Sequence, residues 1–374
     1  MGDKKIKINF IINSLDGGGA EKVLIDLVNN LSIEKYDITI SSLSDGVNSK
    51  RMIKNIKWRH LCKRNSLIEK IMHHMPLFIL CRFLVKKDSD INVAYLEGLP
   101  TKVLAKGKLN GRKVAFIHMD ISKSNVFTSL YKNKNKCLKD YNRFDRVCFV
   151  SRDAMNSFIS YYGEIKTACV LHNVVDLRKA YELSKMDVIA QNSIHNDRFK
   201  ICMVGRLSPE KGINRALDAF SILNAKHNFD VYIVGDGKEK KALIEKKEKL
   251  DLNNVFFLGF QENPYSIISK MDLLLCTSFF EGYSTVTIEA ISLGVPVLTT
   301  DCAGMKDILM GGKYGIITKN DISSIIDGLD NVLSDRCLYE TLKKNTDHYC
   351  MKLDRNNMCA DYDKLFNDMM REDL

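Results

Sequence analysis

Two glutamates, Glu281 and Glu289, lie eight positions apart around the start of a predicted helix in the second half of the chain. The apolar run Leu273 to Thr277 before them is typical of a buried strand. A strand, a turn of small residues and a helix start leave backbone N–H groups free where a phosphate can bind. The two carboxylates then suit the hydroxyls of a sugar on one side of a diphosphate and of a ribose on the other.

This glutamate pair resembles the paired-glutamate motif of family 4 retaining glycosyltransferases. The likeness extends, in the family's order, to three other segments: Asp16 to Glu21 (DGGGAE), Val204 to Gly212 (VGRLSPEKG) and Ile233 to Gly237 (IVGDG). It covers nearly the whole chain, strongly in residues 199 to 310 and loosely between residues 40 and 110. The resemblance implies an α/β fold of the GT-B type, with two Rossmann-like, doubly wound parallel-sheet domains that face each other across a cleft.

The resemblance also implies a role for each matching residue. Arg206 and Lys211 would hold the donor diphosphate and neutralise the leaving group, which fixed cations and backbone donors can do without a metal. Glu281 would contact donor-sugar hydroxyls near the reacting carbon, and Glu289 the ribose. The predicted catalytic residues are His118, Arg206, Lys211 and Glu281. The predicted donor-binding residues are Gly18, Gly19, Gly205, Gly237, Phe260, Gln261, Gly282, Tyr283, Ser284, Thr285 and Glu289. The plainer alternatives are a solvated charge pair and an ordinary helix glutamate.

In the first half, Gly17, Gly18 and Gly19 follow a predicted strand and open a helix, which suits close approach to a phosphate or an acceptor. They are no dinucleotide fingerprint, because Lys22 occupies the third required glycine position, and NAD binding is disfavoured. His118 ends another predicted strand, at the edge where open sheets bind ligands. It resembles the family's cleft histidine that contacts the donor sugar or the acceptor; a structural role is the alternative.

No metal ion and no resident cofactor are expected. The segment Asp88-Ser89-Asp90 resembles the metal-binding Asp-x-Asp of the other common glycosyltransferase fold. It lies between a predicted helix and a predicted strand without the rest of that fold's pattern. The sugar nucleotide is therefore expected as a co-substrate that binds without a divalent cation.

Short apolar runs alternate with longer helical patterns twice along the chain, which is typical of βαβ units and parallel sheets. The predicted strands are residues 7–14, 37–43, 91–96, 113–118, 146–150 and 167–171, then 199–204, 230–234, 255–258, 273–277, 297–299 and 315–317. We predict an acceptor domain over residues 1–184, a linker over 185–198 and a donor domain over 199–353. By resemblance, a last helix of about 354–374 would pack back on the first domain.

The charge of the chain is unevenly distributed. Residues 1–185 hold 33 Lys and Arg against 18 Asp and Glu, whereas the remainder holds 23 against 28. The basic half favours an anionic membrane surface or a phosphorylated substrate. Nucleic acid is disfavoured, because few aromatic residues lie among the basic ones and no binding module is recognisable.

The segment Leu67 to Lys87 is a candidate membrane element. Its apolar part, Met75 to Val85, is too short to cross a bilayer, which takes about 20 apolar residues. It would lie in the interface plane with its basic residues towards anionic lipid. The alternative is a helix that packs on the first sheet.

Two features predict the compartment. The strand-like stretch that begins at Ile6 leaves no room for a secretory signal peptide. The eleven cysteines are scattered, and several lie within apolar runs, as buried reduced thiols do. We therefore expect a cytoplasmic protein, peripheral on the inner face of the membrane.

These inferences converge on a retaining, metal-independent glycosyltransferase. It would transfer a hexose or N-acetylhexosamine from a nucleotide-diphosphate sugar, with UDP as the family's commonest nucleotide, to a lipid-linked glycan in surface polysaccharide biosynthesis. The rival hypotheses are a nucleotide-sugar epimerase of the same fold, a non-catalytic sugar-nucleotide-binding subunit of a transferase complex and a basic RNA-binding protein.

Overall fold

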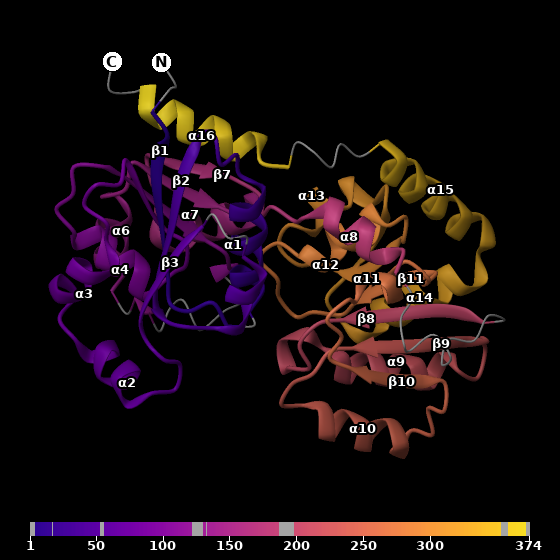
Figure 1. Cartoon of the computed structure of the whole chain (residues 1–374). Coiled ribbons are helices and arrows are strands. Elements are labelled where there is room, and N and C mark those ends of the chain that lie inside the picture. The colour runs from indigo at the N-terminus through magenta and orange to yellow at the C-terminus, as the bar shows by residue number, and fades with distance from the viewer. Residues whose placement is uncertain are drawn as a thin grey trace. The chain divides into compact units, whose positions relative to one another are not determined.

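The computed structural model describes residues 4–16, 18–52, 56–121, 130–131, 133–186, 198–352 and 358–371. The chain divides into two compact units (Figure 1). Unit 1 comprises Met1–Asp176 together with Asn357–Leu374, and unit 2 comprises Leu177–Asn356. Each unit is built around one parallel sheet.

The sheet of unit 1 has seven strands in the order β3-β2-β1-β4-β5-β6-β7. These strands are β1 (Ile6–Ile12), β2 (Tyr36–Ser44), β3 (Lys57–Cys62), β4 (Ile91–Ala94), β5 (Arg112–Ile117), β6 (Arg146–Phe149) and β7 (Ala168–Val170). The order reverses between β1 and β4, which is the switch point of a doubly wound sheet. Side chains alternate across β1, so Phe10 enters one core and Ile11 the other.

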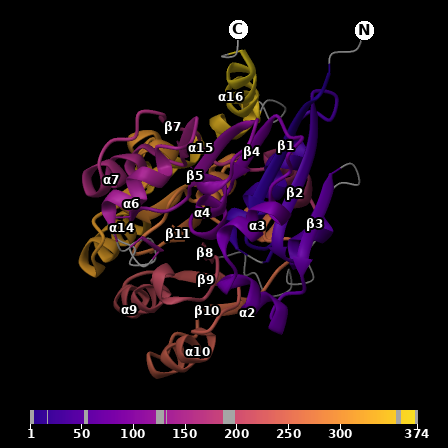
Figure 2. The same ribbon diagram turned by 90° about the vertical axis from the view of Figure 1, so that its left-hand side faces the viewer.

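Helices cover both faces of this sheet. They are α1 (Gly19–Asn30), α2 (Leu67–His74), α3 (Leu77–Leu84), α4 (Leu99–Lys106), α6 (Lys134–Tyr141), α7 (Arg152–Tyr162) and α16 (Ala360–Arg371), with a 3₁₀ turn η1 (Val47–Arg51). Figure 2 shows α3, α4, α6 and α7 on the face turned to the viewer. The C-terminal helix α16 buries Tyr362, Phe366 and Met369 in the core that contains α1. Its Asp363 accepts a hydrogen bond from the Tyr36 hydroxyl at 2.9 Å.

The sheet of unit 2 has six strands in the order β10-β9-β8-β11-β12-β13. They are β8 (Phe199–Val204), β9 (Phe229–Val234), β10 (Val255–Gly259), β11 (Leu273–Cys276), β12 (Val297–Thr300) and β13 (Gly315–Thr318). The helices are α8 (Leu177–Ser184), α9 (Ile213–Leu223), α10 (Lys240–Lys249), α11 (Tyr265–Ile268), α12 (Thr285–Ser292), α13 (Met305–Ile308), α14 (Ile322–Ser334) and α15 (Arg336–Lys352), with 3₁₀ turns η4 (Pro209–Lys211) and η5 (Met310–Gly312). Here the order reverses between β8 and β11, and the loops after these two strands carry the predicted donor site.

The structure differs from the sequence-based expectation at two places. Strand β3 was not predicted, because its residues Lys57, Arg59 and His60 interrupt the apolar pattern of an edge strand that is largely uncovered. Residues 177–184, which the predicted boundary assigned to the first domain, form helix α8 and belong to unit 2, where Leu183 O accepts a hydrogen bond from Asn263 Nδ2 at 2.9 Å. Of the predicted linker, residues 187–197 lie outside the described part of the chain.

Candidate functional site

An ion pair joins the two loops at the switch point of unit 2. Lys211 Nζ lies 2.7 Å from Glu281 Oε1, which also accepts a hydrogen bond from Ser278 Oγ at 2.6 Å. The two charged side chains are 29% and 13% exposed. Burial by itself would lower the pKa of Lys211, but the negative charge and the hydrogen bond of Glu281, together with smaller contributions from neighbouring groups, raise that pKa above its ordinary value. Lys211 is therefore a fixed cation at neutral pH.

The turn that carries Lys211 is locked against the loop after β11. Gly212 adopts a left-handed conformation (φ +63°), and a Cβ there would clash with Thr277 O. The Thr277 hydroxyl donates to Lys211 O and Gly212 O at 3.2 and 3.0 Å, and Phe279 N donates to Glu210 O at 2.8 Å. The backbone therefore fixes where the lysine side chain begins.

Arg215 also links the turn that carries Lys211 to the loop after β11. The sequence analysis did not single it out. Its guanidinium donates to Thr277 O at 2.7 and 3.1 Å and to Ser278 O at 3.0 Å. It also donates to the side chain of Asn320 at 2.6 Å. The only signal in the sequence is an arginine within the apolar stripe of α9, where it is 8% exposed.

Helix α12 begins beside this ion pair and has a free N-terminus. Its N-cap residue, Ser284, makes no side-chain hydrogen bond to the backbone of the first turn. The first-turn amides at and after Thr285 therefore have no side-chain cap and can bind an anion. A small cavity of about 20 Å³ is lined by residues of both loops and of α12, among them Gly205, Lys211, Glu281 and Val286.

Glu289 lies one turn further along, on the buried side of α12. It is 3% exposed, and its Oε1 accepts a hydrogen bond from the Tyr265 hydroxyl at 3.4 Å. The two predicted carboxylates thus lie at separate places, Glu281 before the helix and Glu289 within it. That separation fits ligand groups on opposite sides of a phosphate.

The other predicted donor contacts of unit 2 lie in loops after its strands. Arg206 is exposed in the loop after β8. Phe260 is 65% exposed after β10, and the Gln261 side chain donates to Leu258 O at 2.8 Å. Gly237 N donates to Asp236 Oδ1 at 2.7 Å. Gly282 and Tyr283 precede α12, and burial raises the pKa of the Tyr283 hydroxyl.

The predicted residues of unit 1 lie at the carboxyl ends of its strands. Gly18 is the N-cap of α1 and Gly19 its first residue, whereas Gly17 is outside the described residues. His118 follows β5, and its ring packs on Tyr95 and Phe116 with centroid distances of 4.8 and 5.8 Å. Burial lowers the pKa of His118 to about 4. Its ring nitrogens are buried, and neither makes a hydrogen bond of normal geometry to a described residue.

Glu97 contacts the backbone of His118 and was not among the predicted site residues. Its carboxylate accepts a hydrogen bond from the backbone N–H of His118, and the side chain is 6% exposed. Burial raises the pKa of Glu97 to about 7. The sequence signal is slight: a glutamate directly before Gly98, at the end of an apolar strand.

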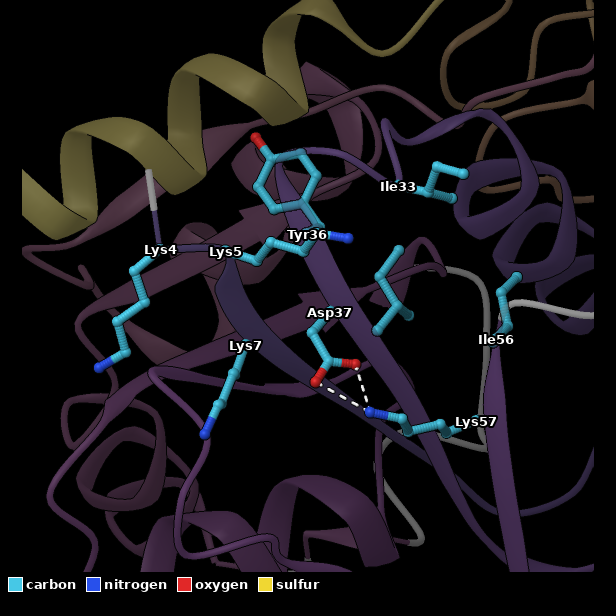
Figure 3. Close-up of a pocket in the computed structure, with 9 residues that line it drawn as sticks. Lys4, Lys5, Lys7, Ile33, Tyr36, Asp37, Ile56 and Lys57 are labelled. Atoms are coloured by element: carbon cyan, nitrogen blue, oxygen red, sulfur yellow. Dashed lines mark hydrogen bonds and ion pairs between the residues drawn. The ribbon is translucent and has the colours of Figure 1, made fainter. Parts of the chain in front are cut away.

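A larger pocket of about 430 Å³ opens at the amino ends of β1 and β2 and beside β3 (Figure 3). It is lined by Lys4, Lys5, Lys7, Ile33, Tyr36, Asp37, Ile38, Ile56 and Lys57. Within it, Lys57 Nζ binds Asp37 at 2.8 Å (Figure 3). It contains none of the predicted site residues and lies at the sheet edge opposite to the one where open α/β sheets bind ligands. Among the described residues, no group of three or more His, Cys, Asp or Glu is placed to hold a metal ion.

Two doubly wound parallel sheets with loop sites at their switch points define the GT-B class of glycosyltransferases. A solved structure with this fold, Anabaena HepE in complex with UDP and glucose, superposes with a TM-score of 0.79 at 21% sequence identity, covering 97% of this chain and 99% of that one. At that identity the likeness establishes the fold alone.

Sequence comparison identifies a glycosyltransferase domain in the chain. Residues 184–349 match the family model of glycosyl transferases group 1. It is 34% identical over 178 residues to an uncharacterized glycosyltransferase of Methanocaldococcus jannaschii, a match that spans 43% of this chain and 44% of that protein. It is 25% identical over 372 residues to a Campylobacter jejuni enzyme, named N-acetylgalactosamine-N,N'-diacetylbacillosaminyl-diphospho-undecaprenol 4-alpha-N-acetylgalactosaminyltransferase, covering 95% of this chain and 98% of that one.

Proposed function

We propose that the chain is a retaining, metal-independent family 4 glycosyltransferase that transfers a hexose or N-acetylhexosamine from a UDP-sugar to a lipid-linked glycan in surface polysaccharide assembly. The observation that carries this proposal is the Lys211–Glu281 pair beside the uncapped N-terminus of α12. A cation, uncapped backbone N–H groups and a carboxylate that can accept hydrogen bonds from sugar hydroxyls lie side by side. A sugar diphosphate would require these three kinds of group.

Lys211 and Arg206 would neutralise the diphosphate, with the first-turn amides of α12. Charge builds on the β-phosphate as its bond to the sugar carbon breaks, and preorganised donors stabilise that charge most in the transition state. The acceptor hydroxyl would attack the same face of the sugar and pass its proton to the departing phosphate oxygen. Glu281 would accept hydrogen bonds from sugar hydroxyls, and Glu289 from the ribose.

The nature of the donor and acceptor draws on the similar proteins. The structure of HepE contains UDP and glucose, which supports a UDP-sugar donor here. The name of the Campylobacter jejuni enzyme specifies a glycan on diphospho-undecaprenol, which supports a lipid-linked acceptor. The excess of basic residues in the first half fits a phosphorylated lipid carrier and its membrane.

The test begins with nucleotide binding. A thermal-shift panel of UDP, GDP, ADP and TDP, each with EDTA and with Mn²⁺, should give one clear shift that does not depend on metal, because a ligand of the native state raises its apparent stability. Product analysis with the matching donor sugars follows, with and without acceptor. A donor converted to its epimer without acceptor would refute transfer, and no shift with any nucleotide would refute the donor site.

A further inference from the structure

Two consecutive helices of unit 1 carry a group of exposed apolar side chains. On α2, Leu67, Ile68 and Ile71 are 73%, 56% and 56% exposed, and on α3, Phe78 and Phe83 are 75% and 48% exposed. We call these five residues the α2–α3 apolar surface. Exposed apolar residues are ordinary when they occur singly, but a concentration of them marks an interaction site.

The core of unit 1 does not need these side chains. Helix α3 already buries Leu80 and Leu84 in the core. Its C-terminal carbonyl, Leu84 O, accepts hydrogen bonds from Asn9 Nδ2 at 3.2 Å and Arg59 Nη2 at 3.0 Å. Phe78 and Phe83 are therefore held outward by a helix whose other face is fixed to β1 and β3.

Helix α2 is fixed in a similar way, through Glu69. This buried carboxylate accepts hydrogen bonds from Ser44 Oγ, Asn65 N and Arg64 Nη1 at 2.7, 2.6 and 2.9 Å. These bonds outweigh the effect of burial, so the pKa of Glu69 lies below its ordinary value. The hydrogen bonds of Glu69 hold α2 against β2, whereas Leu67, Ile68 and Ile71 of α2 remain exposed to solvent.

The surroundings of this surface are basic. Residues 63–87 contain six lysines and arginines, whereas Glu69 is their only acidic residue and is buried. The exposed basic side chains are Lys63, Lys70, Arg82 and Lys87, whereas Arg64 is exposed but paired with Glu69 and Asp16. Exposed apolar and basic side chains on one segment match the headgroup region of an anionic bilayer, in which apolar groups enter the acyl boundary and cations meet lipid phosphates.

We propose that α2 and α3 dock unit 1 on an anionic membrane by inserting the α2–α3 apolar surface. No helix among the described residues is long and apolar enough to span a bilayer, so the contact would lie in the interface plane. Helix α2 lies beyond the carboxyl ends of the strands (Figures 1 and 2), the sheet edge that also carries Gly18 and His118. The inference rests on the proposed function in one respect: it places the membrane that holds the acceptor at this edge.

A second copy of the chain is the rival occupant. Like charges around the surface disfavour self-association, because two copies facing each other would bring their excess cations together. An anionic lipid surface resolves this repulsion, whereas a copy of the same surface increases it.

The experiment is co-sedimentation of the full chain with vesicles of phosphatidylcholine, with and without phosphatidylglycerol. The wild type should bind the anionic vesicles and lose binding at high salt. The double variant Ile68→Ser/Phe78→Ser should bind them about a hundredfold more weakly, since each lost apolar side chain removes of the order of tenfold in partitioning. Ile222→Ser is the matched control, because Ile222 is 50% exposed on α9 in unit 2; it should bind as the wild type does.

Charge and self-association are tested separately. Lys70→Glu/Arg82→Glu should reduce binding to anionic vesicles about tenfold or more, at roughly 1 kcal/mol for each cation near the surface. The proposal is overturned if the wild type ignores anionic vesicles, or if the Ile68/Phe78 variant binds them fully. It is also overturned if light scattering shows a dimer that this variant abolishes.

UDP binding keeps this inference distinct from the proposed function. All variants of the α2–α3 apolar surface should retain the wild-type thermal shift with UDP, and transfer to a water-soluble acceptor should be unchanged. If the wild type binds vesicles but no nucleotide, only the proposed function is refuted. If it binds UDP but no vesicles, only the membrane inference is refuted.

Discussion

Lys211 and Glu281 follow two neighbouring strands of one sheet, and their charged atoms lie 2.7 Å apart. Each offsets the other's charge in a partly buried place, where an unpaired charge would be costly. A diphosphate would compete with Glu281 for Lys211 and release the carboxylate to accept hydrogen bonds from a sugar. The pair would thus hold both groups ready without leaving either charge uncompensated.

Lys211→Met should lower kcat at least about 100-fold, comparable to the loss of one preorganised donor at a transition-state charge. The reason is that the methionine keeps the volume of the stem but cannot neutralise the leaving diphosphate. Initial rates at saturating donor give the measurement. Lys246→Met is the matched control, because Lys246 of α10 pairs with Asp218 of α9 at 2.6 Å and is not one of the predicted site residues; near-wild-type kcat is expected.

Glu281→Gln should lower activity as well, and the double variant with Lys211→Met should lose less than the product of the two single effects. Groups that act on one ligand as a unit give non-additive losses. Full additivity across this double-mutant cycle would contradict a shared donor site.

Glu289→Gln should weaken UDP binding by about 1.5–3 kcal/mol, the cost of a lost hydrogen bond to a charged group. Isothermal titration with UDP and with 2′-deoxy-UDP gives the test, because the wild type should prefer the ribose and the variant should lose that preference. Tyr265→Phe removes the hydroxyl that donates to Glu289 at 3.4 Å and serves as the control. If Glu289→Gln still preferred UDP over 2′-deoxy-UDP, Glu289 would not be the residue that binds the ribose.

EDTA should leave transfer by the wild type unchanged, and added Mn²⁺ or Mg²⁺ should not increase it. Lys211, Arg206 and the amides of α12 would supply the charge compensation that a divalent ion supplies elsewhere. Donor turnover after exhaustive chelation is the measurement. Activity that EDTA abolishes and a divalent cation restores would contradict this prediction.

Sequence reasoning located twelve of the thirteen strands in the part of the chain that the structure describes, because buried parallel strands appear as short apolar runs. It missed β3, whose edge position lets Lys57, Arg59 and His60 interrupt that pattern. In the predicted site, Glu281 and Glu289 stand out through spacing and a helix start. Arg215 and Glu97 do not, since their importance comes from carbonyl and amide groups that only the folded chain brings to them.

Glu97 should make the stability of unit 1 depend on pH. Burial raises its pKa from 4.5 to about 7, so the folded state prefers the protonated form. The stability from this group is fully present below pH 4.5 and is lost as the pH rises through 7. His118 acts oppositely: with its pKa lowered to about 4, its contribution is present above pH 6.5 and is lost as the pH falls towards 4. The two trends partly cancel in the wild type.

Glu97→Gln isolates the first trend, because glutamine keeps an oxygen for the His118 amide but does not ionise. The free energy of unfolding of this variant, relative to the wild type, should rise between pH 5 and pH 8 by up to about 3 kcal/mol, at roughly 1.4 kcal/mol per pKa unit. Denaturant unfolding followed by the fluorescence of Trp58, the chain's one tryptophan, reports on unit 1 specifically. A wild-type-to-variant difference that stays constant across this range would mean that Glu97 is ionised throughout, with the amide hydrogen bonds outweighing its burial.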